Sequence, residues 1–199
     1  LWAVDEGLQR LPDAPMEMGE HAHTVSIVTS DHGYFYGEHG LNEERRLAYE
    51  ETARIPLIIR YPRVARPGST PSQLVQVIDL APTIVALTAV TDTVPRQGRP
   101  LVPLLADTAS SWRQSVLMEY YSDRVFPRML DMAYQALRTE RHKYIDYLEL
   151  PEMDEMYDLV ADPFELENLI GTPAGDSLLP ALREELRRLQ RETGYRADF

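Results

Sequence analysis

The order of the helical and strand-like patterns changes near Asp107, and this change is the main constraint on the fold. Before it, short apolar or β-branched runs alternate with stretches whose apolar residues recur every three or four positions. The strand patterns cover 24–29 and 56–62, and the helical patterns cover 1–11, 45–52 and 79–90. Alternation of this kind is typical of an α/β domain built on a parallel sheet. We therefore predict an α/β domain over residues 1–110.

Beyond Asp107, strand patterns follow one another with no helical pattern between them. They cover 115–121, 134–138, 143–147 and 156–159, with a polar turn at 139–142. The chain then carries its strongest amphipathic pattern, 178–192, whose apolar stripe consists of Leu178, Leu182, Leu186 and Leu189. These patterns predict a small α+β domain over 111–199, with an antiparallel sheet and a C-terminal helix.

Composition excludes several classes of partner. The 199 residues are 44% hydrophobic and 26% charged, as in globular rather than disordered proteins. The net charge of −12 argues against a nucleic-acid partner, because such proteins carry an excess of cations. No apolar run reaches the roughly 18–20 residues that cross a membrane, so no membrane partner is expected. Since the chain has no cysteine, it has neither a disulfide nor a thiolate nucleophile. The compartment is left open.

The first candidate site is the end of the strand pattern 24–29, which runs into Ser30, Asp31, His32 and Gly33. In open α/β sheets ligands bind at the carboxyl ends of strands. A carboxylate such as that of Asp31 suits Ca²⁺ or Mg²⁺, and an imidazole such as that of His32 suits Zn²⁺ or Mn²⁺. Two ligands are too few for a closed metal site. The residues alone also allow Asp31 to cap the loop and His32 to be a surface residue.

Other chemistry-bearing residues are less specific. His39 is a second imidazole in a glycine-rich loop, and it could equally lie on the surface. His21 and His23 lie in a polar loop, which favours no metal role. Arginines gather over 45–66, and arginine suits bidentate contacts with oxyanions. No nucleophile elbow, P-loop or dinucleotide-binding glycine motif is present.

The order of several short motifs resembles the sulfatase family of the alkaline phosphatase-like superfamily. The motifs are Asp5-Glu6-Gly7, 25–33, 37–41, 49–51, 54–62, 78–83, 97–98, 137–139, 142–145, 157–159, 162–165 and 168–169. Single motifs of this length are weak, but their shared order extends over nearly the whole chain. The resemblance implies the C-terminal part of an alkaline phosphatase-like sandwich, followed by the small α+β lobe.

The resemblance also implies roles for particular residues. It assigns Asp31 and His32 as two ligands of one divalent cation, most commonly Ca²⁺, with Mg²⁺, Mn²⁺ or Zn²⁺ as alternatives. It places substrate contacts at His39, Arg45 and Arg46. The family usually has a sulfate-binding lysine where this sequence has Glu44, so Arg45, or else Arg46, is expected to replace it after a shift of one residue. Apart from the resemblance, the aromatic residues of loops 120–132 and 34–36 are further candidates for contacting the substrate, and they could equally pack between the two lobes.

Two features of the family are missing from this sequence. One is an acidic pair that supplies the other metal ligands, and the second is a Cys/Ser-x-Pro-x-Arg segment whose first residue becomes the formylglycine nucleophile. The resemblance therefore covers the C-terminal half and implies hydrolysis of a small-molecule or glycan sulfate monoester by the intact protein. The chain alone is expected to be inactive. The alternatives are a phosphonate or phosphodiester hydrolase, or a truncated non-catalytic chain that forms an oligomer or aggregates.

Overall fold

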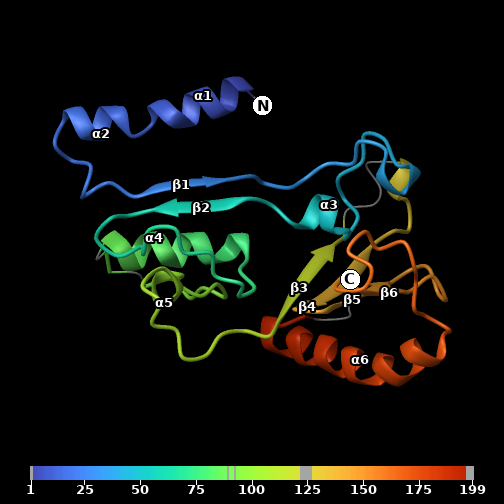
Figure 1. Ribbon diagram of the computed structural model, residues 1–199. Coiled ribbons are helices and arrows are strands. Elements are labelled where there is room, and N and C mark those ends of the chain that lie inside the picture. The colour runs from blue at the N-terminus through green and yellow to red at the C-terminus, as the bar shows by residue number, and fades with distance from the viewer. Residues whose placement is uncertain (1, 89, 92, 122–126, 196–199) are drawn as a thin grey trace. The chain divides into compact units, whose positions relative to one another are not determined.

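The computed structural model describes residues 2–88, 90–91, 93–121 and 127–195 (Figure 1). The chain forms two compact units, each described here by itself. Unit 1 consists of Leu1–Asp31, Pro56–Pro71 and Ile78–Ser110, and unit 2 consists of His32–Ile55, Ser72–Val77 and Ser111–Phe199. Residues 32–55 thus group with the C-terminal part of the chain. The assignment of 1–110 to one catalytic domain stays a prediction.

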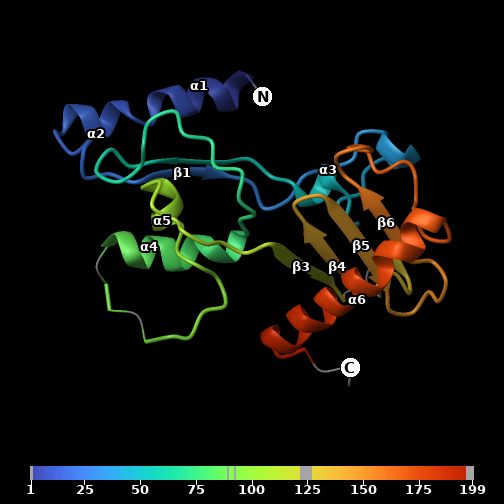
Figure 2. The same ribbon diagram turned by 60° about the horizontal axis from the view of Figure 1, so that its bottom comes forward.

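Unit 1 contains a two-stranded antiparallel ribbon with helices on both sides (Figures 1 and 2). Its elements are α1 (Trp2–Arg10), α2 (Asp13–Glu17), β1 (Ser26–Thr29), β2 (Leu57–Arg60), α4 (Leu80–Thr88) and α5 (Val102–Leu105), and the 3₁₀ turn η2 (Val77–Asp79) precedes α4. The expected parallel pairing is wrong for β1 and β2, whose register joins Ser26 to Arg60. The residues between the strands, 32–55, belong to unit 2 and therefore provide no crossover helix on this ribbon.

The core of unit 1 is small. Neither α1 nor α2 has a buried residue, and Trp2 is 93% exposed. The tight contacts lie around α4, where the Arg99 N–H donates to the Asp79 carboxylate (2.7 Å) and the Leu101 N–H donates to the Thr83 hydroxyl (2.8 Å). Asp79 and Thr83 are wholly buried, so these bonds satisfy polar groups that burial would otherwise leave unpaired.

Unit 2 is built on a four-stranded antiparallel sheet in the order β3-β4-β5-β6. The strands are β3 (Ser115–Tyr120), β4 (Tyr134–Thr139), β5 (His142–Tyr147) and β6 (Glu155–Asp158); the remaining elements are α3 (Glu50–Ala53), the 3₁₀ turns η1 (Glu38–Gly40) and η3 (Pro127–Met129), and α6 (Pro173–Thr193). The predicted hairpin of β4 and β5 and the terminal helix are confirmed. Helix α6 begins five residues earlier than its apolar stripe suggested, because the Thr172 hydroxyl accepts the Gly175 N–H (3.1 Å) and caps it.

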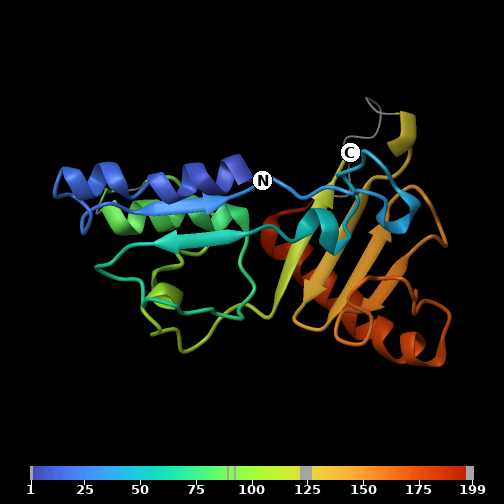
Figure 3. The ribbon, with the colours of Figure 1, turned by 45° about the horizontal axis from the view of Figure 1, so that its top comes forward.

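The two faces of this sheet are covered by different segments (Figures 1 and 3). Since side chains alternate along a strand, neighbours on β4, β5 and β6 point to opposite sides. One face packs on α6, in a cluster formed by Leu137, Tyr144, Met156, Leu182 and Leu186. The other face packs on the segment 32–55, in a cluster that includes Phe35, Leu47, Tyr49, Ala136, Ile145 and Tyr157. The segment 32–55, which covers this second face, contains most of the residues to which the sequence assigns a function.

Among the described residues, none of the helices combines the length and the apolar character that a membrane span requires.

Candidate functional site

The segment 32–55 is fixed by backbone hydrogen bonds within itself. The N–H of Gly33 donates to the Thr52 carbonyl (2.9 Å), and that of Tyr34 donates to the Glu51 carbonyl (3.0 Å). Gly33 lies so close to Glu51 that an added Cβ would be 1.9 Å from its carbonyl oxygen. The glycine of the Asp-His-Gly motif is therefore required by close backbone approach.

Asp31 and His32 are the last residue of unit 1 and the first of unit 2. The Nδ1 atom of His32 lies 2.7 Å from the Gly33 carbonyl oxygen. Because a carbonyl only accepts, Nδ1 carries the proton and Nε2 carries the lone pair, as in most metal-binding histidines. The Asp31 carboxylate is exposed and accepts a hydrogen bond from the Ser30 hydroxyl (3.3 Å). The donor set thus fits a divalent cation, although the part of the chain that the structure describes contains no cluster of three such ligands.

His39 is carried by a turn with several left-handed residues. Gly37 has a φ of 127°, His39 of 54° and Gly40 of 69°, and an antiparallel bridge from Tyr36 to Asn42 closes the turn. Left-handed backbone is uncommon for residues other than glycine. This turn directs the His39 side chain inward, where it is only 11% exposed. The surface alternative therefore does not hold for His39.

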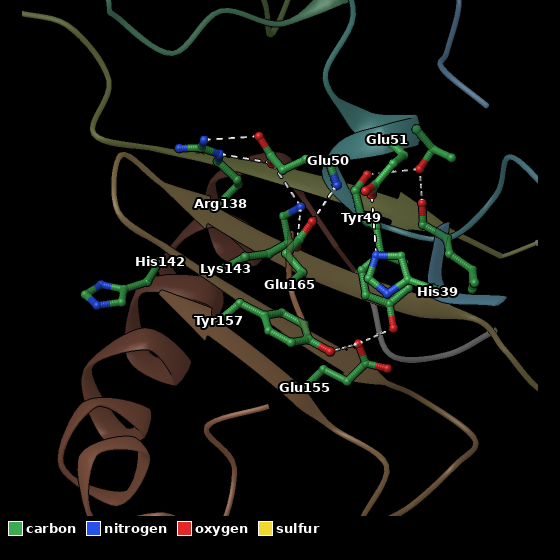
Figure 4. Close-up of polar contacts among 12 residues, drawn as sticks. His39, Tyr49, Glu50, Glu51, Arg138, His142, Lys143, Glu155, Tyr157 and Glu165 are labelled. Carbon is green, nitrogen blue, oxygen red and sulfur yellow. Dashed lines mark hydrogen bonds and ion pairs between the residues drawn. The ribbon is translucent and has the colours of Figure 1, made fainter. Parts of the chain in front are cut away.

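The inward-facing imidazole of His39 lies between an aromatic ring and a carboxylate (Figure 4). It stacks on Tyr49 with ring centroids 4.0 Å apart and planes inclined by 21°, and it meets Phe35 edge-on at 5.9 Å. Its Nε2 lies 3.5 Å from Oε2 of Glu51. Both neighbours belong to the same short stretch, since Glu51 lies in α3 and Tyr49 immediately precedes that helix.

Arg45 and Arg46 have different environments. The carboxylate of Glu44, which is 5% exposed, accepts the backbone N–H of both arginines (2.7 and 3.0 Å) and a guanidinium N–H of Arg46 (2.9 Å). Accepting these bonds lowers the pKa of Glu44, although burial acts to raise it. The Arg46 carbonyl in turn accepts the Tyr134 hydroxyl (2.8 Å). The Arg45 side chain is exposed and makes no hydrogen bond or ion pair with a described residue.

The expected helix over 45–52 is wrong in its first half, because α3 covers only Glu50–Ala53. Leu47, Ala48 and Tyr49 are all buried, and three consecutive residues of a surface helix cannot all face one side. The Glu44 carboxylate also holds the two following N–H groups in a turn. Tertiary burial therefore outweighs the helical spacing here.

A buried ion cluster beneath this segment was not predicted. Lys143 on β5 is 0% exposed, and its Nζ lies 2.7 Å from Glu165 and 2.9 Å from Glu50 (Figure 4). The second carboxylate oxygen of Glu165 accepts the N–H of Glu50 (2.6 Å) at the start of α3, and Arg138 on β4 also pairs with Glu50 (3.3 Å). The cluster thus joins α3, two strands and the 159–171 loop.

The pKa values of the two carboxylates in the cluster are shifted in opposite directions. Burial raises the pKa of Glu165 above its usual value, and Lys143 only partly opposes this. For Glu50 burial acts in the same direction, but Lys143 and Arg138 outweigh it and hold the pKa below its usual value. The sequence signal for this cluster is slight: the chain's lone lysine shares the period-two register of Ile145 and Tyr147, which face the buried segment.

The remaining candidates are less informative. The His21 imidazole contacts the Arg60 guanidinium, and Nδ1 of His23 lies 3.1 Å from Arg63. Within the proposed substrate loop 120–132, residues 122–126 lie outside the described residues.

Comparison with solved structures gives the class of protein first. A structure described as a complex with its substrate D-glucosamine-2-N,6-O-disulfate matches with a TM-score of 0.86 and 34% identity, over 96% of this chain and 38% of that one. The phosphonate monoester hydrolase of Agrobacterium radiobacter matches with a TM-score of 0.83 and 25% identity, over 95% of this chain and 39% of that one. The fold is therefore that of the C-terminal part of the alkaline phosphatase-like sulfatases, as expected.

The particular family follows from the sequence itself. Residues 37–192 match the family described as N-sulphoglucosamine sulphohydrolase, C-terminal, and the chain belongs to that family. A relative in Bacteroides thetaiotaomicron, N-acetylglucosamine-6-O-sulfatase, is 37% identical over 173 residues, which cover 85% of this chain and 30% of the relative. The chain thus spans between 30% and 39% of the length of these three proteins.

The ion cluster generates a prediction about stability. Replacing Lys143→Met leaves the buried Glu165 carboxylate without its cation and Glu50 with Arg138 alone, and we expect the free energy of unfolding to fall by about 3–5 kcal/mol. Arg141→Met is the matched control on the same hairpin, because the Arg141 side chain is 61% exposed and, among the described residues, pairs with Asp158 alone. That change should cost less than about 1 kcal/mol. Chemical denaturation of both variants measures the difference, and equal losses would contradict the role given to Lys143.

Proposed function

We propose that this chain is the C-terminal part of a hydrolase that cleaves sulfate monoesters, with a formylglycine nucleophile supplied by residues outside this sequence. Membership of the sulphohydrolase family carries the proposal. A relative named as a sulfatase and a structural neighbour solved with a sulfated glucosamine support it. The substrate class we propose is therefore a sulfate ester of an amino sugar, free or within a glycan.

Asp31 and His32 would hold one divalent cation, most commonly Ca²⁺, together with ligands from outside the chain. The bound cation would polarise the sulfate oxygens and orient the nucleophile. The Nδ1 proton of His32 is held by the Gly33 carbonyl, so the ring is oriented in advance for coordination through Nε2.

Arg45 is the residue we propose for contacting the sulfate. Its guanidinium has no partner among the described residues, whereas that of Arg46 is tied to Glu44. Glu44 occupies the position of the family's usual lysine, and its buried carboxylate supports the turn that carries Arg45. Arginine can bind two oxyanion oxygens at once through its planar fork.

The exposed apolar surface of unit 1 supports the view that the chain works within a larger assembly. Trp2 is 93% exposed, Met18 is 74% exposed and Ile58 on β2 is 61% exposed. Large exposed apolar side chains favour contact with further protein. Additional residues of the same polypeptide or a second copy of the chain would provide it.

A phosphonate hydrolase is the second candidate, because the Agrobacterium radiobacter structure matches almost as well and a shared fold does not fix the substrate.

Purified intact protein should be assayed with N-acetylglucosamine 6-sulfate and with a phosphonate monoester. We expect a higher kcat/KM for the sulfate ester, loss of activity on metal chelation, recovery with Ca²⁺, and no turnover by the present chain alone. A higher kcat/KM for the phosphonate would favour the phosphonate hydrolase. Turnover by this chain alone would refute the proposal that the nucleophile lies outside it.

Replacing Arg45 and replacing Arg46 should have different effects on the KM and on the melting temperature. Arg45→Ala should raise the KM for the sulfate ester about 10-fold or more, since a charge-assisted hydrogen bond contributes about 1.5–3 kcal/mol. Its thermal stability should stay unchanged. Arg46→Ala should instead lower the melting temperature, because it removes the cation beside buried Glu44. Steady-state kinetics and thermal unfolding of both variants test this. An unchanged KM in Arg45→Ala would show that a residue other than Arg45 contacts the sulfate.

A further inference from the structure

His39 and Glu51 each have a buried polar atom that makes no hydrogen bond, and these two atoms face each other. The Nε2 atom of His39 and the Oε2 atom of Glu51 are both inaccessible to solvent, lie 3.5 Å apart, and have no other partner among the described residues. A buried polar atom left unpaired is unfavourable. A small approach would let the Glu51 carboxylate accept a hydrogen bond from Nε2–H, and catalytic hydrogen bonds that are long in the free protein often shorten when the ligand is bound.

The imidazole ring is held in its plane by a second contact. It stacks on Tyr49, whose hydroxyl donates to Glu155 (2.7 Å), and the same carboxylate also accepts the Tyr157 hydroxyl (2.8 Å) (Figure 4). The Tyr49 ring is therefore anchored at its far end to β6. Stacking on Tyr49 thus fixes one face of the imidazole, and Nε2 lies beside Glu51.

The carboxylate of Glu51 is carried by backbone that is itself fixed. The Glu51 carbonyl accepts the Tyr34 N–H (3.0 Å), and the preceding residue, Glu50, binds buried Lys143. Neighbouring residues of a helix point in different directions, so Glu50 faces the ion cluster while Glu51 faces His39.

The other ring nitrogen has a different environment. Nδ1 makes no hydrogen bond with a described residue, and it is not among the buried unpaired atoms, so it keeps access to solvent. Figure 4 shows it on the side of the ring that points away from Glu51. With Nε2 directed toward the Glu51 carboxylate, Nδ1 is the ring nitrogen that can accept a hydrogen bond from a ligand. A sulfate oxygen cannot donate a hydrogen bond to Nδ1, because it only accepts hydrogen bonds. A sugar hydroxyl can donate one.

We propose that Glu51 and Tyr49 position His39 so that its Nδ1 accepts a hydrogen bond from a hydroxyl of the substrate's sugar ring. This inference rests on the proposed function and makes His39 a specificity residue for sulfated sugars over aryl sulfates. Sites built to bind a substrate hydroxyl discriminate strongly against analogues that lack it. Glu51 and Tyr49 are positioning residues, since they act through His39.

The test compares two substrates on the intact protein, N-acetylglucosamine 6-sulfate and p-nitrophenyl sulfate. His39→Ala and Glu51→Ala should each lower kcat/KM for the sugar ester about 10-fold, which corresponds to about 1.4 kcal/mol. The losses should not add in the double variant. The kcat/KM for p-nitrophenyl sulfate, which has no sugar hydroxyl, should fall less than that for the sugar ester, and thermal unfolding of each variant shows whether it is folded. Glu51→Gln keeps an oxygen acceptor for Nε2–H and should recover the sugar ester's kcat/KM to within about threefold.

Each other outcome counts against a specific claim. Equal losses on both substrates, no loss on the sugar ester, or a Glu51→Gln variant as impaired as Glu51→Ala would overturn this inference and leave the proposed function standing. A wild-type protein that hydrolyses neither sulfate ester would overturn the proposed function itself.

Discussion

The buried ammonium of Lys143 is the interaction on which the arrangement of unit 2 depends. It binds Glu165 and Glu50, which are 115 residues apart in the sequence. Lys143 and Glu165 are closed to solvent, whereas the Glu50 side chain is 17% exposed. Glu165 also accepts the first N–H of α3, so one carboxylate both neutralises the lysine and caps the helix. Because a buried charge without its partner is strongly unfavourable, the segment 32–55 and the 159–171 loop must dock on the sheet together.

The candidate site is built on that docked segment. Glu50 and Glu51 are adjacent in α3, and their carboxylates face the ion cluster and His39 respectively. The carbonyls of α3 hold Gly33 and Tyr34, which directly follow the proposed metal ligands in the chain. A displacement of α3 would therefore alter the surroundings of His39 and the anchoring of His32 together. The ion cluster thus links core stability to the geometry of the proposed reaction centre.

The sequence predicted those features that local patterns determine. The β4–β5 hairpin and α6 follow from alternation, a polar turn and a leucine stripe, all within short stretches. The antiparallel pairing of β1 with β2 and the short extent of α3 were missed, because contacts between distant residues determine them. Lys143 was missed for a related reason: its carboxylate partners Glu50 and Glu165 lie far from it in the sequence. The roles of Asp31, His32, Arg45 and Arg46 came from resemblance and stay predictions.

Amide hydrogen exchange in a Lys143→Met variant tests the central claim most directly. If Lys143 holds the segment 32–55 in place, the amides of Gly33 and Tyr34 should exchange faster than in wild type, since their acceptors are the carbonyls of α3. The amides between β4 and β5 should lose less protection than those two, because they exchange only when the whole sheet opens. Unchanged exchange at Gly33 and Tyr34, or a uniform increase across the whole sheet, would contradict the account.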